Sequence, residues 1–168
     1  MTTPENELKV PILQSYPDGQ KRFEQVTVEM ENKQNRQTEF NRLLDQSIAQ
    51  NSATLNDKFN NNHNFEPSAN SSARVNNIAK RIFDQGKFAH QITSQLEKGE
   101  VVLDVNQKNG LNKLLHDVVQ GNTKEFSANL ENMGHLLKMN QSDRTLPIVE
   151  KIQAQIAEKL LKTLQLAR

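Results

Sequence analysis

Apolar side chains recur every three or four residues through the second half of the chain, from about residue 73 onward. This spacing places them along one face of an α-helix, whereas a half-buried strand would alternate apolar and polar residues. Four such segments follow one another, separated by short connections that favour antiparallel packing of neighbouring helices. We therefore predict an all-α fold in which 73–168 forms a four-helix, up-down bundle.

Capping residues mark the ends of the first two helices. Ser71 and Ser72 are good N-cap residues, because a serine hydroxyl accepts a hydrogen bond from a first-turn backbone N–H, and Gly99 is a C-cap signal. Asp104 is the predicted N-cap of the second helix, which Gly121 ends. The first helix should therefore begin near residue 73, and the second should follow residue 104.

The third and fourth helices also have start signals. Asn122 with Glu125 three residues later predicts a capping box. Thr145 is the predicted cap of the last helix, and Pro147 suits its first turn, where a missing N–H costs nothing. Glycines inside the predicted helices mark kinks, close-packing points or a break in this helix assignment: Gly86, Gly110 and Gly134.

The first half of the chain differs, because 21–62 predicts one long polar helix with a single narrow apolar stripe. The stripe is interrupted where Lys33 and Gln37 occupy its positions. This pattern is typical of a coiled coil or of a docking helix, and such a helix needs a packing partner to be stable. The predicted partner-binding residues are those of the stripe: Phe23, Val26, Met30, Phe40, Leu44, Ile48, Leu55 and Phe59.

The segments on either side of this helix look irregular. Residues 1–20 contain several prolines, and Tyr16–Gly19 is a strong turn signal. An alternative is a hairpin that pairs Val10–Tyr16 with Phe23–Met30, because Val26, Val28 and Met30 alternate as in a strand. Residues 63–72 form a predicted linker and domain boundary, since turn formers dominate and Pro67 interrupts a helix.

The sequence offers little for catalysis. Cysteine is absent, so thiolate zinc sites and thiol chemistry are excluded. The four histidines form no two-histidine motif, and no phosphate-binding or nucleophile-elbow pattern occurs. We predict no catalytic or metal residues, no cofactor and no small-molecule substrate.

No apolar stretch approaches the ~20 residues of a membrane span, and no signal peptide is visible. We therefore expect a cytoplasmic location without membrane insertion, with a nuclear one left open.

A basic face on the first helix of the predicted bundle supports an alternative partner. Residues 1–70 hold seven Lys/Arg and ten Asp/Glu, so the rest of the chain carries the excess positive charge. Such a face can contact phosphates, although base stacking lacks its usual aromatic platform, since Trp is absent. The candidate nucleic-acid residues are Arg74, Lys80, Arg81 and Lys87.

Several runs in the second half resemble one helical domain. They are Lys98–Leu103, Gly110–Leu115, Asn122–Ala128 and Ile156–Leu160. Over 73–165 the chain resembles the domain shared by the steroid receptor RNA activator protein and the C-terminus of the large outer-coat subunit of COPII vesicles. The family's frequent Trp residues and its preceding proline-rich segment are missing. The resemblance implies a helical adaptor in coat assembly or RNA-linked regulation, without catalytic residues.

The sequence predicts a non-catalytic interaction or assembly protein, a subunit or adaptor of a larger complex, or a self-associating chain. Its low hydrophobic content of 35% and the partnerless stripe support this prediction. Two alternatives stay open: an RNA- or DNA-associated regulatory factor that uses the basic face, and a bacterial effector or secretion chaperone.

Overall fold

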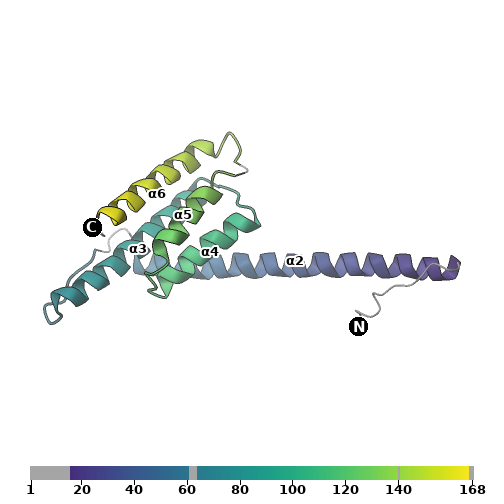
Figure 1. Cartoon of the computed structure of the whole chain (residues 1–168), viewed down its shortest axis with the longest axis horizontal. Helices are drawn as coiled ribbons and strands as arrows, with labels where there is room; N and C mark the ends of the chain where they lie inside the picture. The colour runs from purple at the N-terminus through teal and green to yellow at the C-terminus, as the bar shows by residue number, and fades with distance from the viewer. Residues whose placement is uncertain (1–15, 61–63, 140, 167–168) are drawn as a thin grey trace. The chain divides into compact units, whose positions relative to one another are not determined.

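The structure, a computed structural model, describes residues 16–60, 64–139 and 141–166, together with the side chains of these residues from Met30 to Leu164. Across these residues it contains helices and no strand, so the predicted all-α class is confirmed there (Figure 1). The helices are α2 (Tyr16–Lys58), α3 (Ala73–Lys98), α4 (Val105–Val119), α5 (Phe126–Leu136) and α6 (Leu146–Leu166).

The chain divides into two units, Met1–Leu43 and Leu44–Arg168, and the division falls inside α2. The sequence had suggested a boundary at 63–72 instead. The difference has a physical reason, because Leu44, Leu55 and Phe59, in and just after the last part of α2, are buried. The last four turns of α2 therefore belong to the compact second unit.

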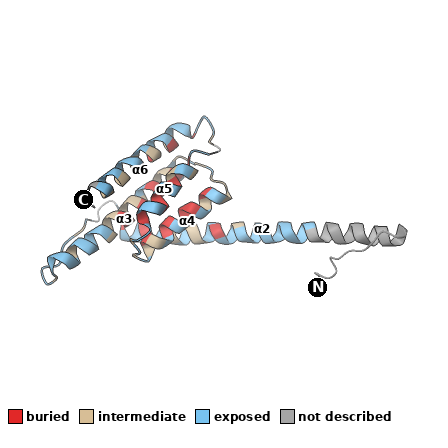
Figure 2. Ribbon diagram, viewed as in Figure 1, coloured by how far each residue is buried: buried red, intermediate tan, exposed pale blue. Residues whose placement is uncertain are grey.

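The second unit is built on four helices that contact one another in a closed order. α3 packs against α4 and α6, and α5 packs against the same two helices. Figure 2 shows the buried residues gathered on the inner faces of these helices. The core cluster draws on every helix and on the residues that flank them: Leu55, Phe59, Ala89, Ile92, Leu96, Leu111, Leu114, Leu115, Val118, Phe126, Leu130, Met133, Leu137, Val149, Ile152 and Ile156.

Close packing around Gly86 fixes the end of α2 against α3. A Cβ atom on Gly86 would lie 2.5 Å from Cε2 of Phe59, so only glycine leaves room for this ring. The Phe59 ring also meets Phe83 edge-on, with 5.1 Å between ring centroids. Of the expectations for Gly86, close packing is the one confirmed.

The predicted caps of α3 and α4 are confirmed. The Ser72 hydroxyl accepts a hydrogen bond from Val75 N at 3.2 Å. Asp104 accepts one from Gln107 N, and the Gln107 side chain accepts one from Asp104 N, both at 2.8 Å. This reciprocal pair is a capping box that the sequence did not single out.

The predicted start of the third helix is wrong. α5 begins at Phe126, and its N-cap Glu125 makes no side-chain cap hydrogen bond. Asn122 Oδ1 instead accepts a hydrogen bond from Lys124 N at 3.1 Å, which closes a local turn. An asparagine side chain can accept a hydrogen bond either within a turn or at a helix end, and Asn122 forms the turn.

The expectations for the N-terminal region are corrected in part. Tyr16–Gly19 is helical rather than a turn, because α2 begins at Tyr16 and proline is tolerated in a first helical turn. The hairpin alternative is wrong for Phe23–Met30, which lies within α2. Its other strand, up to residue 15, and most of the segment predicted to be irregular lie outside the described residues. α2 ends at Lys58, shortly before the predicted end at 62.

Candidate functional site

The first candidate surface is the part of α2 from Met30 to Leu43, here called the exposed helix segment. Every side chain in it is exposed except that of Asn41. The exposed ones include three large apolar side chains: Met30 is 66% exposed, Phe40 47% and Leu43 50%. Scattered apolar side chains are normal on a surface, but a whole exposed helix carrying them is typical of an unpaired docking helix.

The polar side of the exposed helix segment carries a local ion pair. Arg42 donates a hydrogen bond from Nε to Glu39 Oε1 at 3.1 Å. This hydrogen bond, with the charge of the guanidinium, holds the pKa of Glu39 below its usual value. Both side chains are solvent-exposed, so the pair contributes little to stability.

The structure divides the predicted partner-binding stripe. Leu44, Leu55 and Phe59 are buried within the second unit, and Ile48 is partly buried against the same core. Met30 and Phe40 are exposed. Phe23 and Val26 lie in α2, but their side chains are outside the described residues. Among the described side chains of the stripe, those of Met30 and Phe40 therefore remain available to a partner.

A polar seam, which the sequence did not reveal, joins the last part of α2 to α4. Asn112 Oδ1 accepts hydrogen bonds from Ser47 Oγ and Asn51 Nδ2, both at 3.1 Å. Lys108 Nζ lies 2.8 Å from Asp45 Oδ1. Ser47 and Asn51 gave no sequence signal, since their partner lies 61–65 residues away.

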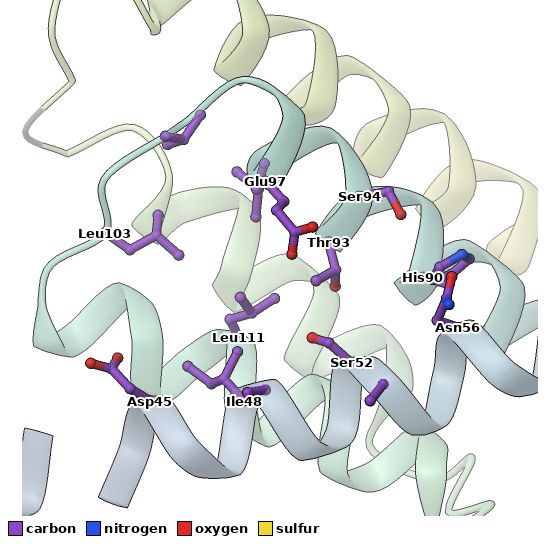
Figure 3. A pocket seen from close by; sticks show the side chains of 14 residues that line it. Asp45, Ile48, Ser52, Asn56, His90, Thr93, Ser94, Glu97, Leu103 and Leu111 are labelled. Atoms are coloured by element: carbon purple, nitrogen blue, oxygen red, sulfur yellow. The ribbon is translucent and has the colours of Figure 1, made fainter. Parts of the chain in front are cut away.

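The second candidate surface is a groove within the second unit, between α2 and α3 (Figure 3). Its volume is about 560 Å³, which is within the range of ligand sites. We call it the α2–α3 groove. It is lined by Asp45, Ile48, Ala49, Ser52, Ala53 and Asn56 from α2, by His90, Thr93, Ser94, Leu96 and Glu97 from α3, and by Val101, Leu103 and Leu111.

The lining combines an apolar floor with a few polar groups. Leu96 and Leu111 are buried, and Val101 and Leu103 are half-buried. Ser52 Oγ is buried and has no hydrogen-bond partner among the described residues. Thr93 Oγ1 differs, because it donates to Ala89 O at 2.9 Å. The groove therefore holds an unsatisfied polar atom close to apolar surface.

The predicted nucleic-acid residues lie in α3, between Arg74 and Lys87. Arg74, Lys80 and Arg81 are exposed. Lys80 Nζ lies 3.1 Å from Asp84 Oδ2, and Lys87 Nζ lies 5.9 Å from the centroid of the Phe83 ring. The Asp84 carboxylate offsets part of the positive charge that a phosphate backbone would meet.

The described residues contain no group of three or more His, Asp or Glu side chains that could hold a metal ion. In the part of the chain described, no helix is long and apolar enough to cross a membrane. Comparison of the chain with protein-family models, curated proteins and solved structures found no match.

Proposed function

We propose that this chain is a non-catalytic interaction protein, a subunit or adaptor that docks on a protein partner through the N-terminal part of α2. In this proposal residues 16–43 act as a docking arm, and Leu44–Arg168 is the folded body. The body is an up-down bundle of α3 to α6, to which the end of α2 adds a further helical layer.

The observation that carries the proposal is the exposed helix segment. Helices draw most of their stability in water from tertiary packing of one apolar face. Met30, Phe40 and Leu43 lie in a helix and yet keep about half or more of their side-chain surface exposed. A partner that buries these side chains gains about 25 cal/mol for each Å² of apolar surface.

The chemistry of the segment indicates the kind of partner. Met30 and Phe40 lie ten residues apart and about 80° from each other around the helix, and the ion pair between Glu39 and Arg42 lies outside the arc between them. An amphipathic helix of this kind fits an apolar groove or another helix. A protein surface therefore suits it better than a nucleic acid does.

The test compares two double variants of the full chain, expressed with an affinity tag in its native source. Met30→Glu with Phe40→Glu places charges on the apolar face. Asn35→Glu with Thr38→Glu adds the same charge on the opposite side of the same segment. We expect the amount of co-purifying protein to fall at least about tenfold in the first variant, a change of about 1.4 kcal/mol in binding free energy. The control should keep it.

Both variants should unfold at the temperature of the unmodified chain, because all four side chains are exposed. Equal amounts of co-purifying protein from both variants would contradict the docking arm. Sedimentation of the purified chain shows whether the partner is a second copy of the chain or a different protein. The resemblance of 73–165 to the coat and RNA-activator domain stays a prediction, and the proposal does not rest on it.

A further inference from the structure

The α2–α3 groove lies in the second unit and plays no part in the proposed docking arm. We propose that this groove binds an amphipathic helix of a partner protein, one that carries a lysine or arginine beside its apolar face. The groove would then be a second interaction surface, on the folded body itself.

The apolar part of this site is the floor of the groove. Leu96 and Leu111 form it, with Ile48 from α2 and Val101 and Leu103 from the connection between α3 and α4. The rim is open to solvent, because Ala49, Ala53 and Asn56 are exposed. An open apolar trough suits a peptide laid along it better than an enclosed small molecule.

A helix is the best-fitting shape for the occupant. The α2 wall from Asp45 to Asn56 is about 16 Å long at the rise of an α-helix, which is about three turns. Ala49, Ser52 and Ala53 on this wall are small and allow close approach. The walls are helices, whose backbone groups are already paired, so an added strand would find no edge to bond to.

The charge of the groove points to a cationic occupant. The Glu97 carboxylate lines the groove and forms no ion pair among the described residues. The other acidic side chain there, Asp45, is neutralised by Lys108. His90 also lines the groove, at the end away from Asp45 (Figure 3). One uncompensated negative charge therefore remains, at Glu97.

Ser52 shows that the α2 wall of the groove also contains an unpaired polar atom. Its buried Oγ lacks a hydrogen-bond partner among the described residues, although it lines the same groove as Glu97. A buried polar atom is expected to be paired. An ammonium or guanidinium group has only donors, so it pairs with the exposed Glu97 carboxylate, whereas Ser52 Oγ lies beneath the surface of the groove. A lysine or arginine beside apolar side chains would therefore pair with Glu97.

The probe is a fluorescent amphipathic peptide of about four helical turns, with leucines on one face and lysines beside them. A second peptide carries glutamates in place of the lysines. We expect the full chain to bind the lysine peptide at least tenfold more tightly, as measured by fluorescence anisotropy. Glu97→Lys should remove this preference. Glu150→Lys, the same change at an exposed α6 position outside the groove, should preserve it.

Methyl NMR of the full chain locates the peptide. The Val101 and Leu103 methyl signals should shift on binding, while that of Met30, on the proposed docking arm, should not. The groove proposal would be overturned by equal binding of the two peptides or by equal effects of Glu97→Lys and Glu150→Lys. Shifts at Met30 alone would also overturn it. Groove signals that shift with protein concentration without peptide would also overturn it, in favour of a second copy. None of these results depends on whether the docking arm finds its partner.

Discussion

At the scale of single residues, Gln107 links two helix ends that are far apart in the sequence. Its side chain is 1% exposed. Oε1 accepts a hydrogen bond from Asp104 N at 2.8 Å, and Nε2 donates to Leu136 O and Met139 O, each at 2.8 Å. Gln107 therefore satisfies one orphan N–H at the start of α4 and two carbonyls at the end of α5.

Replacing Gln107 by leucine should destabilise the second unit by about 2–4 kcal/mol, because three part-buried backbone groups lose their partner at once. The measurement is urea unfolding followed by circular dichroism. The matched control is Gln153→Leu, since Gln153 makes one such bond, to Gly134 O at 3.0 Å. If Gln153→Leu lowers the free energy of unfolding as much as Gln107→Leu does, the hydrogen bonds of Gln107 add nothing to ordinary packing.

At the scale of helices, α2 is a single helix with two environments. Leu55 is fully buried, whereas Leu43, twelve residues earlier, is 50% exposed. We expect Leu55→Ala to lower the free energy of unfolding by about 2–5 kcal/mol, through lost apolar burial and the cavity left behind. Leu43→Ala should cost less than about 0.5 kcal/mol. Thermal unfolding of both variants measures the difference, and similar losses would contradict the division within α2.

The stripe on α2 shows how far sequence reasoning reaches. Period and capping signals predicted the helices of the second unit, including the caps at Ser72 and Asp104, because such signals are local. They did not separate Leu55 from Phe40, since both occupy the same stripe and only the packing of the second unit decides which is buried. Asn122 was misassigned for a related reason, because its side chain had two local uses of similar strength.

The candidate site was predictable only in part. The exposed apolar residues of the docking arm follow from a narrow stripe on a polar helix. The α2–α3 groove does not, because its walls come together from segments more than thirty residues apart in sequence. Glu97 and Ser52 are ordinary residues in their own helices. Only packing brings the free carboxylate and the unpaired hydroxyl to the same groove.

At the scale of the whole molecule, the two units should differ in resistance to proteolysis. Proteases cut where the chain opens locally, and opening is easiest where few side chains are buried. Lys33, Arg36 and Arg42 lie in the exposed helix segment. Lys58 is exposed as well, but it adjoins Phe59, which is buried against Gly86. A trypsin site at Lys58 should therefore open only when the end of α2 leaves the core.

Brief digestion of the full chain with trypsin should give a lasting fragment that begins at Leu43, as identified by mass spectrometry. Cleavage after Lys58 should be at least about tenfold slower than cleavage after Arg42, which corresponds to about 1.4 kcal/mol of extra opening free energy. Leu55→Ala should bring the cleavage rates at Lys58 and Arg42 closer together, because it weakens the packing that holds the end of α2. A lasting fragment that begins instead beyond residue 58 would favour the boundary at 63–72 and would make the whole of α2, including the α2 wall of the groove, separable from the body.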